Sequence, residues 1–284
     1  MSTNDASAAG TIDIGGDLTV NRMGFGAMRI TGDGIWGDPP DLDEARAVLR
    51  RAVELGVNFI DTADSYGPEV SERLIGEALS PYPDDLVIAT KAGLERTGPN
   101  QWPVNGHPDH IKAACEGSLR RLGIEQIALY QWHRPDSSVP LEDSVGAFVE
   151  LKDQGKLRHF GVSNVSEEQL RQIQAITPVV SIQNRYNPGD RTSEGLVDLC
   201  EQEDMAFLPW APIQNLDGNS GIQAAADAHG AAPRQVALAW LLARSPAMTV
   251  IPGTGSRAHL ESNVAAAALA LTPEEVAAIT DGAG

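Results

Sequence analysis

Three side chains capable of acid–base chemistry stand at the ends of short apolar segments, and a fourth lies in the loop after one of them. Asp61 ends the segment VNFID, and Tyr66 follows it by five residues. Lys91 comes directly after LVIAT, and His133 ends another apolar stretch. Nearly continuous apolar runs of this length are typical of parallel strands buried on both faces. Because parallel strands of a barrel open their carboxyl ends on one rim, we expect the four side chains to meet there.

An aspartate, a tyrosine, a lysine and a histidine at one rim are suited to carbonyl reduction. A phenol has a pKa of about 10 in water, and a neighbouring ammonium group lowers it. Lys91 would act in this way on Tyr66, and Asp61 would hold Lys91 charged and oriented. His133 would donate a hydrogen bond to the carbonyl oxygen or help to relay the proton. No side chain can supply hydride, so this chemistry requires a nicotinamide.

Each of these residues alone has a plainer interpretation. A single histidine such as His133 is more often a core residue with satisfied hydrogen bonds, and an aspartate such as Asp61 often caps a helix. A lysine directly after a buried strand is harder to explain, because buried charges are rarely unpaired. The combination therefore indicates a reducing site better than any one member does.

The elements that must position these residues follow a regular alternation. Short apolar runs alternate with longer helix-patterned segments from one end of the chain to the other. This rhythm is typical of parallel strands joined by helical crossovers, and eight such units predict a (β/α)8 barrel of the α/β class. Helices are expected at 41–55, where Asp41 or Asp43 can cap the start, and at 232–245. The strands are expected at 23–28, 57–61, 86–91, 127–133, 158–163, 179–184, 205–210 and 248–252.

The segment TIDIGGDLTV at 11–20 has two alternating pieces around Gly15-Gly16, which predicts a β-hairpin at the bottom of the barrel. No linker or charge run divides the chain, so residues 1–284 are expected to form a single domain. Three segments are expected to be active-site loops that decide the substrate, namely 31–40, 92–108 and 213–221.

Composition limits the partners and the compartment. The formal net charge is −18, which argues against nucleic acid and anionic membranes as partners. No apolar run reaches the roughly 18 residues of a membrane span, and the start MSTNDASAAG does not resemble a signal peptide. We therefore expect a cytoplasmic protein. Cys115 and Cys200 lack the spacing of a zinc or redox pair and are expected to be buried thiols.

At this point the chain resembles the aldo-keto reductase family over nearly its whole length. The resemblance implies a (β/α)8 reductase of small carbonyl compounds in which Asp61, Tyr66, Lys91 and His133 are catalytic, with no departure from the family set. Within the family, the later motifs look most like a bacterial group that includes pyridoxal reductases. The matching segments are VNFIDTADSYG, IATKAG, YQWHRPD, GKLRHFGVSN and IPGTGSRAHLESN.

The same resemblance implies a set of cofactor-binding residues. Ser163, Asn164 and Gln183 would bind the nicotinamide carboxamide, and Trp210 would stack under the ring, where the family more often has tyrosine. The phosphates of the adenosine half would lie on the glycine-rich turn before a helix N-terminus. The full implied set is Gly26, Ala27, Met28, Asp61, Ser163, Asn164, Gln183, Trp210, Ala211, Pro212, Gly253, Thr254, Ser256, His259 and Asn263.

The sequence departs from many NADPH-specific members at two of these positions. Gly253 and His259 stand where such members have lysine and arginine, which leaves Arg257 as the nearest strong cation. NADP(H) is therefore expected from the resemblance, and NAD(H) stays open.

Other interpretations of the sequence also stay open. The chain could be a nicotinamide-binding redox sensor or regulatory protein with little turnover, although the intact set of four residues counts against it. It could be a metal-dependent hydrolase using His107, His110, Asp61 and Asp64, but the HPDH segment is expected to lie in a loop, and we expect no metal. Trp36 and Trp132 are either pocket walls or plain packing residues. The physiological substrate and the oligomeric state are not determined by the sequence.

Overall fold

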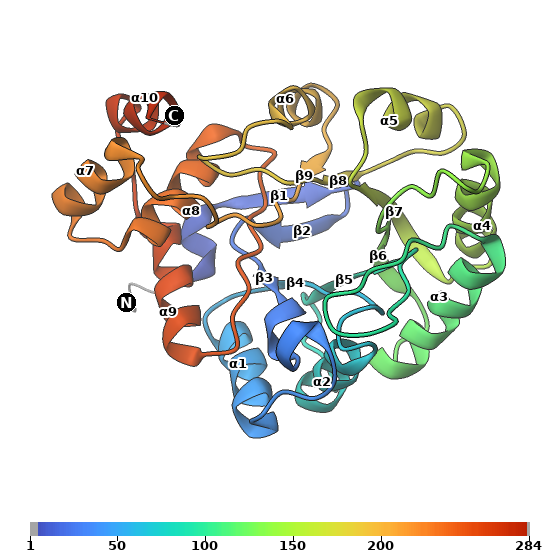
Figure 1. The fold of residues 1–284 in the computed structure, drawn as a ribbon. Helices are drawn as coiled ribbons and strands as arrows, with labels where there is room; N and C mark the ends of the chain where they lie inside the picture. The colour runs from blue at the N-terminus through green and yellow to red at the C-terminus, as the bar shows by residue number, and fades with distance from the viewer. Residues whose placement is uncertain (1–4, 283–284) are drawn as a thin grey trace.

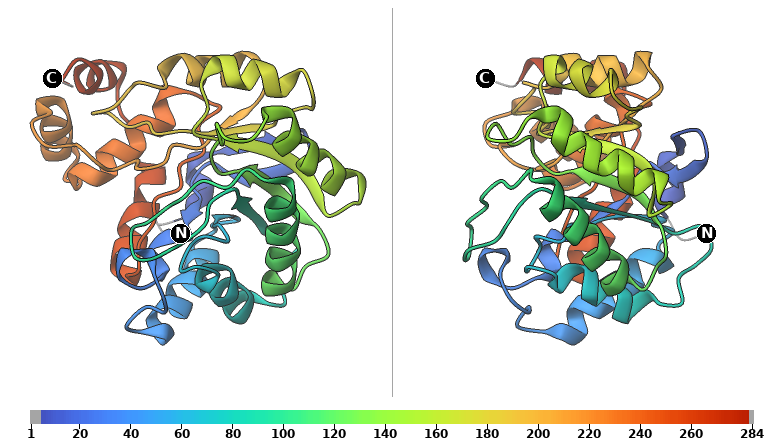
Figure 2. Two further views of the ribbon diagram at one scale, coloured as in Figure 1. Left: turned by 45° about the vertical axis from the view of Figure 1, so that its right-hand side comes forward. Right: turned by 90° about the vertical axis from the view of Figure 1, so that its right-hand side faces the viewer.

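The computed structural model describes residues 5–282, and its centre is a ring of parallel strands. Seven assigned strands lie side by side in chain order, each parallel to the next. Helices lie outside the strands in all three views (Figures 1 and 2). The predicted α/β barrel is thus confirmed. The strands are β3 (Phe25–Gly26), β4 (Phe59–Asp61), β5 (Val87–Ala92), β6 (Ile127–Trp132), β7 (Leu157–Ser163), β8 (Ser181–Gln183) and β9 (Ala206–Phe207).

The eighth predicted strand closes the ring with fewer contacts than expected. Met248 bridges Phe207 of β9, and Val250 bridges Met23 just before β3, both in parallel. The Gly24 N–H donates to the Val250 carbonyl at 2.8 Å, so the segment is hydrogen-bonded to the first strand. Pro252 has no N–H to extend the ladder, which helps to explain why only isolated bridges form here. The other predicted strands agree with the structure to within three residues at each end.

The helices begin where the sequence provides caps. Helix α1 (Leu42–Glu54) begins after Asp41, whose side chain accepts the Glu44 N–H at 2.8 Å. Helix α8 (Pro233–Arg244) matches the predicted apolar helix and has proline in its first turn. The remaining helices are α2 (Val70–Leu79), α3 (Pro108–Leu122), α4 (Leu141–Asp153), α5 (Glu167–Gln174), α6 (Glu194–Gln202), α7 (Ser220–His229), α9 (Arg257–Ala265) and α10 (Pro273–Asp281), with short 3₁₀ turns η1 (Ala6–Ala9), η2 (Ala27–Ile30), η3 (Asp33–Ile35) and η4 (Ala266–Ala268).

The N-terminal hairpin is present and covers the amino-terminal end of the barrel. Strands β1 (Thr11–Ile14) and β2 (Leu18–Asn21) pair antiparallel, and Gly15 and Gly16 have φ of 66° and 82°, which favour glycine. Its buried side chains pack on apolar residues that fill the barrel interior, such as Phe59 and Leu129. In Figure 1 the blue hairpin lies across the centre of the ring.

The three predicted loop segments have little regular structure. Segment 31–40 contains the short turn η3 and one parallel bridge, between Trp36 and Gly67, and 92–108 contains one antiparallel bridge, between Leu94 and Val104. Segment 213–221 is irregular until α7 begins at Ser220. No helix within residues 5–282 is long and apolar enough to cross a membrane. Cys115 in α3 and Cys200 in α6 are free, buried thiols, as expected.

Candidate active site

A cavity of about 620 Å³ opens at the carboxyl ends of the strands. Strands β3, β4, β7 and β8 end, respectively, on Gly26, Asp61, Ser163 and Gln183, and all four of these residues line it. The barrel therefore brings together residues that are far apart in the sequence. The other predicted residues that line the cavity are Met28, Tyr66, His133, Asn164, Trp210, Ala211, Pro212 and Gly253.

The ion pair expected under this cavity is present. Lys91, in β5, has no solvent exposure, and its Nζ lies 2.6 Å from Asp61 Oδ2. Asp61 Oδ1 accepts two further hydrogen bonds, from Gln183 Nε2 at 2.8 Å and Gln131 Nε2 at 3.1 Å. Burial lowers the pKa of Lys91, but the charges of Asp61 and Tyr66 outweigh it and leave that pKa raised. Lys91 is therefore an ammonium group at neutral pH.

Tyr66 lies beside this ammonium group but is not made acidic by it. The Lys91 Nζ donates to the Tyr66 hydroxyl oxygen at 3.4 Å and lies 5.1 Å from the ring centroid. The pKa of Tyr66 is nevertheless raised, because burial raises it more than the charge of Lys91 lowers it. Lys91 lowers the pKa of Tyr66 as expected, but the expectation that this pKa is lowered overall is wrong. Tyr66 holds its proton at neutral pH, with Lys91 offsetting part of the cost of losing it.

His133 stands directly after β6 and faces the same cavity. Its backbone N–H donates to the Ala92 carbonyl at 2.8 Å, and its ring lies 5.8 Å from that of Tyr66 in an edge-to-face arrangement. Burial, with the positive charges of Lys91 and Arg134, holds the pKa of His133 well below its usual range. The imidazole is therefore neutral, with one N–H that can donate and one nitrogen that can accept.

The residues expected around a nicotinamide carboxamide hold one another in place. The Ser163 hydroxyl donates to the Gln183 carbonyl oxygen at 2.7 Å and accepts from Asn164 Nδ2 at 2.9 Å. Asn164 Nδ2 also donates to the His133 carbonyl oxygen at 3.0 Å. Trp210 Nε1 donates to Asn164 Oδ1 at 3.2 Å, which orients the indole at the cavity wall. One polar network thus connects the predicted ring-binding residues to the segment that carries His133.

Two glycines let the first strand and the segment after the eighth lie against each other. A Cβ atom on Gly26 would lie 2.6 Å from the Ile251 carbonyl oxygen, and one on Gly253 would lie 2.5 Å from the Gly26 carbonyl oxygen. No larger residue fits at either position without a shift of backbone. Both glycines form a flat backbone wall at the cavity. Ala27 is buried beside them, and its carbonyl oxygen accepts from Ser71.

The remaining predicted phosphate-binding residues do not line the cavity. Thr254 and Asn263 are buried, and Asn263 Oδ1 has no hydrogen-bond partner among the described residues. His259 is exposed on α9, and Ser256 is half-buried at its start. Thr254 and Ser256 come just before α9, and His259 and Asn263 lie on it.

Arg257, the expected strong cation at this site, is already paired. Glu44 from α1 accepts the Arg257 backbone N–H at 3.1 Å and its Nε–H at 2.9 Å. A carboxylate of the chain itself thus lies at the N-terminus of α9, where a phosphate was expected.

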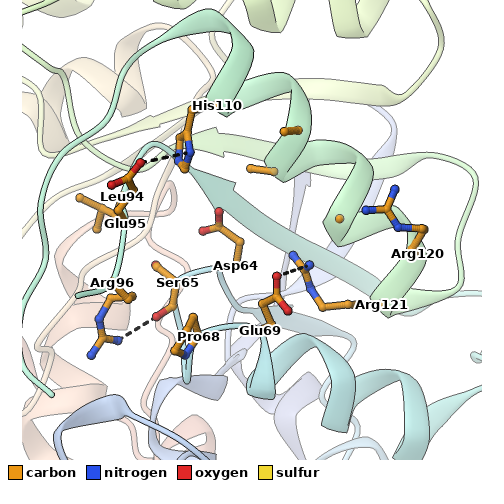
Figure 3. Close-up of a pocket in the computed structure, with 13 residues that line it drawn as sticks. Asp64, Ser65, Pro68, Glu69, Leu94, Glu95, Arg96, His110, Arg120 and Arg121 are labelled. Carbon is orange, nitrogen blue, oxygen red and sulfur yellow. Dashed lines mark hydrogen bonds and ion pairs between the residues drawn. The ribbon is translucent and has the colours of Figure 1, made fainter. Parts of the chain in front are cut away.

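A second hollow, of about 390 Å³, bears on the metal-hydrolase interpretation. It is lined by Asp64 and His110, whose Oδ1 and Nε2 atoms have no hydrogen-bond partner among residues 5–282 (Figure 3). Asp61 lies in the main cavity instead, and His107 caps α3 by accepting the Asp109 N–H at 3.4 Å. The four hypothetical ligands are therefore divided. In the described part of the chain, no group of three or more His, Cys, Asp or Glu residues is placed to hold a metal ion.

The position expected for the HPDH segment is wrong. Pro108 begins α3, so His110 lies in the first turn of a helix and not in a loop. Proline is favoured at this position because its missing N–H would have had no partner inside the helix.

Sequence reasoning missed several residues of the cavity wall. Trp102 lines it and lies edge-to-face with Tyr66, with ring centroids 6.4 Å apart. Trp36 and Trp132 do not line it: Trp132 is buried in the core between strands and helices, and Trp36 is partly exposed. Trp102 lies in an irregular segment, where no hydrophobic periodicity predicts which side chains are buried. The presence of a tryptophan in a predicted active-site loop was the only signal that could have identified it.

Arg96 is a second residue that the sequence did not reveal. Its guanidinium donates to the Ile35 and Ser65 carbonyl oxygens at 2.6 and 2.8 Å, and its Nε donates to the Gln101 carbonyl oxygen at 2.8 Å. It also lies 3.6 Å from the centroid of the Trp102 ring. Figure 3 shows its bond to Ser65. Arg96 therefore ties both predicted loops, 31–40 and 92–108, to the segment that carries Tyr66.

This barrel and site belong to a known class of oxidoreductase. The model of the aldo/keto reductase family matches residues 22–282, and the chain belongs to that family. The resemblance inferred from the motifs is thus confirmed.

Particular relatives show how near the chain lies to others of the family. It is 46% identical over 280 residues to the uncharacterized oxidoreductase C215.11c of Schizosaccharomyces pombe, covering 98% of this chain and 91% of the relative. It is 40% identical over 276 residues to pyridoxine 4-dehydrogenase of Escherichia coli, covering 94% and 96%. A solved aldo/keto reductase from Klebsiella pneumoniae, in complex with NADP and acetate, superposes with a TM-score of 0.80 at 27% identity, covering 95% and 94%.

Proposed function

We propose that this protein reduces an aldehyde or ketone to an alcohol with NADP(H), and that Tyr66 gives the proton to the carbonyl oxygen. The observation that carries the proposal is the buried chain Asp61–Lys91–Tyr66, which ends at a cavity also faced by His133. The proposal treats residues 1–284 as one domain that contains the whole site.

The residues present fit a nicotinamide cofactor. Gly26 and Gly253 line the cavity without side chains, which leaves backbone for a planar ligand to lie against. Trp210 offers an aromatic face at the same cavity, and Asn263 Oδ1 is a buried acceptor that has no partner within residues 5–282. When bound, the cofactor supplies hydride to the carbonyl carbon. Its adenosine phosphates would lie near Thr254, Ser256, His259 and Asn263.

The proposed proton transfer depends on the order in which charges appear. Tyr66 is protonated in the resting site, so it can donate as soon as negative charge develops on the carbonyl oxygen. The phenolate that remains would be stabilised by the ammonium of Lys91, itself held by Asp61. Neutral His133 would donate its N–H to the same oxygen and orient the carbonyl.

Preference for NADP(H) is part of the proposal, and Arg29 supports it. Arg29 is exposed at the cavity, beside Gly253 and Gly255. Within residues 5–282 its guanidinium makes no ion pair with a carboxylate, in contrast to that of Arg257, so it is the cation best placed to meet a phosphate. A solved relative, the Klebsiella enzyme, binds NADP.

The test is a Tyr66→Phe variant. It removes only the hydroxyl group, whose one hydrogen bond in the described part of the chain, from Lys91, is long at 3.4 Å, and it keeps the ring contacts with Trp102 and His133. We expect kcat with nitrobenzaldehyde or methylglyoxal to fall by roughly 10²- to 10⁴-fold. The melting temperature should stay near that of the parent protein, and so should the affinity for NADPH, measured by nicotinamide fluorescence.

Two results would contradict the proposal. Full turnover by Tyr66→Phe would show that Tyr66 is not the proton donor. A parent protein that binds NADPH tightly but consumes none with any aldehyde tested would instead support the redox-sensing alternative.

A further inference from the structure

The walls of the main cavity carry charge opposite to that of the molecule as a whole. The chain has 39 acidic and 21 basic residues, with a net charge of −18. Yet among residues 5–282 the only acidic residue lining the cavity is Asp61, and the buried ammonium of Lys91 neutralises it. The other charged lining residues are two arginines, Arg29 and Arg134. A positive cavity in an acidic protein favours anions locally.

The two arginines belong to different parts of the cavity. Arg29 lies against the backbone of Gly253 and Gly255, on the side proposed for the cofactor phosphates. Arg134 follows His133 in the loop after β6, and its positive charge acts on the imidazole of that histidine. The proposed cofactor therefore accounts for Arg29 but leaves Arg134 without a counter-ion.

Nothing else in the described part of the chain neutralises Arg134. Its side chain makes no ion pair or side-chain hydrogen bond within residues 5–282. The nearby carboxylate of Asp136 is engaged elsewhere, because it accepts the N–H groups of Gly106 and Ser138 at 2.8 and 2.9 Å. Most other arginines of this acidic chain are paired with carboxylates, such as Arg121 with Glu72. An exposed guanidinium beside the proposed hydrogen-bond donor of the reaction is thus available to a ligand.

We propose that Arg134 selects carbonyl substrates that carry a carboxylate group. A planar guanidinium matches a carboxylate with two parallel hydrogen bonds, and one free cation suits one negative charge. Trp102 and Leu94 also line the cavity and supply apolar surface for the carbon skeleton, and Asn100 lines it with an amide group that can donate a further hydrogen bond. The proposal rests on the function proposed above, since it concerns the substrate of the same site.

The experiment compares two probes of nearly equal size, para-carboxybenzaldehyde and its methyl ester. In the parent protein, kcat/KM should be higher for the acid, and the advantage should shrink as salt is added, because screening weakens attraction between exposed charges. In Arg134→Gln, the ratio of kcat/KM for acid to that for ester should fall by roughly 10- to 100-fold, the usual size of a hydrogen bond to a charged group.

Two control variants make the same change of net charge elsewhere. Arg234→Gln alters an exposed arginine of α8 that does not line the cavity, and it should leave the ratio unchanged. Arg29→Gln should raise the KM for NADPH without changing the ratio. Melting temperatures of all variants should agree with that of the parent protein, since neither Arg29 nor Arg134 makes a side-chain ion pair in the described structure.

The outcomes separate this inference from the proposed function. Equal kcat/KM for acid and ester in the parent protein, or an unchanged ratio in Arg134→Gln, would overturn the carboxylate proposal while leaving carbonyl reduction intact. Absence of NADPH consumption with both probes and with nitrobenzaldehyde would overturn the proposed function itself.

Discussion

Replacing Lys91 with methionine tests how the proposed proton transfer is stabilised. At 3.4 Å and an effective dielectric constant of about 20, an ammonium and a full phenolate charge interact by about 5 kcal/mol. If about half of that charge has developed in the transition state, the loss is about 2.5 kcal/mol, or roughly 70-fold in kcat. The expected effect is therefore intermediate between none and the loss of Tyr66 itself.

The pH profile gives a second, independent readout. Lys91 lowers the pKa of Tyr66, so removing the ammonium should raise that pKa further. Carbonyl reduction uses the protonated phenol, so its rate falls as the pH rises through the pKa of Tyr66. Alcohol oxidation uses the phenolate, so its rate rises as the pH passes that pKa. In Lys91→Met the rise of the oxidation rate with pH should therefore occur at higher pH than in the parent protein.

Loss of folding must be separated from loss of chemistry. Lys91→Met leaves the buried carboxylate of Asp61 without its cation, which typically costs about 3–5 kcal/mol of stability. The double variant Asp61→Asn/Lys91→Met removes that charge, and Gln131 and Gln183 remain to bond the new amide. We expect it to melt at a higher temperature than the single variant while remaining slow. A folded variant with near-parental kcat and an unmoved oxidation limb would refute the assigned role of Lys91.

Two further predictions concern groups outside this chain of residues. Arg96→Met removes the donors that hold loops 31–40 and 92–108, so the KM for aldehyde should rise by roughly tenfold with a smaller change in kcat, and limited proteolysis should cut these loops sooner. An unchanged KM and an unchanged rate of cleavage would show that Arg96 does not hold the loops. Glu44→Gln removes a carboxylate from the N-terminus of α9, so the KM for NADPH should fall by roughly two- to fivefold while the KM for NADH changes little. An equal change in KM for both cofactors would show that Glu44 does not face the extra phosphate.

The sequence predicted what depends on periodicity and on strand ends. Asp61 and Lys91 could be brought together because each ends or nearly ends a buried parallel strand, and adjacent parallel strands align such positions. Gly15 and Gly16 predicted the hairpin because their turn needs positive φ. The roles assigned to the individual site residues stay predictions until they are tested by substitution.

Irregular segments were beyond the same reasoning. Trp102 and Arg134 reach the main cavity, and Arg96 reaches the neighbouring smaller hollow, from loops whose course is fixed by contacts with carbonyl oxygens and rings and not by any repeat. The same limit explains why Trp36 could not be placed. Arg257 failed as a free cation for a related reason, since its partner Glu44 lies more than 200 positions away in the sequence.

The raised pKa of Tyr66 shows why a correct set of residues does not by itself give the correct electrostatics. Burial disfavours the phenolate in the resting site, so the tyrosine keeps its proton until negative charge develops on the substrate. The three protons of the Lys91 ammonium go to Asp61 Oδ2 at 2.6 Å, the Thr62 carbonyl oxygen at 2.8 Å and the Tyr66 hydroxyl at 3.4 Å. The longest of these bonds is the one that can shorten when the phenol becomes an anion. Stabilisation by Lys91 is then greater in the transition state than in the resting site, which is the condition for an interaction to accelerate a reaction.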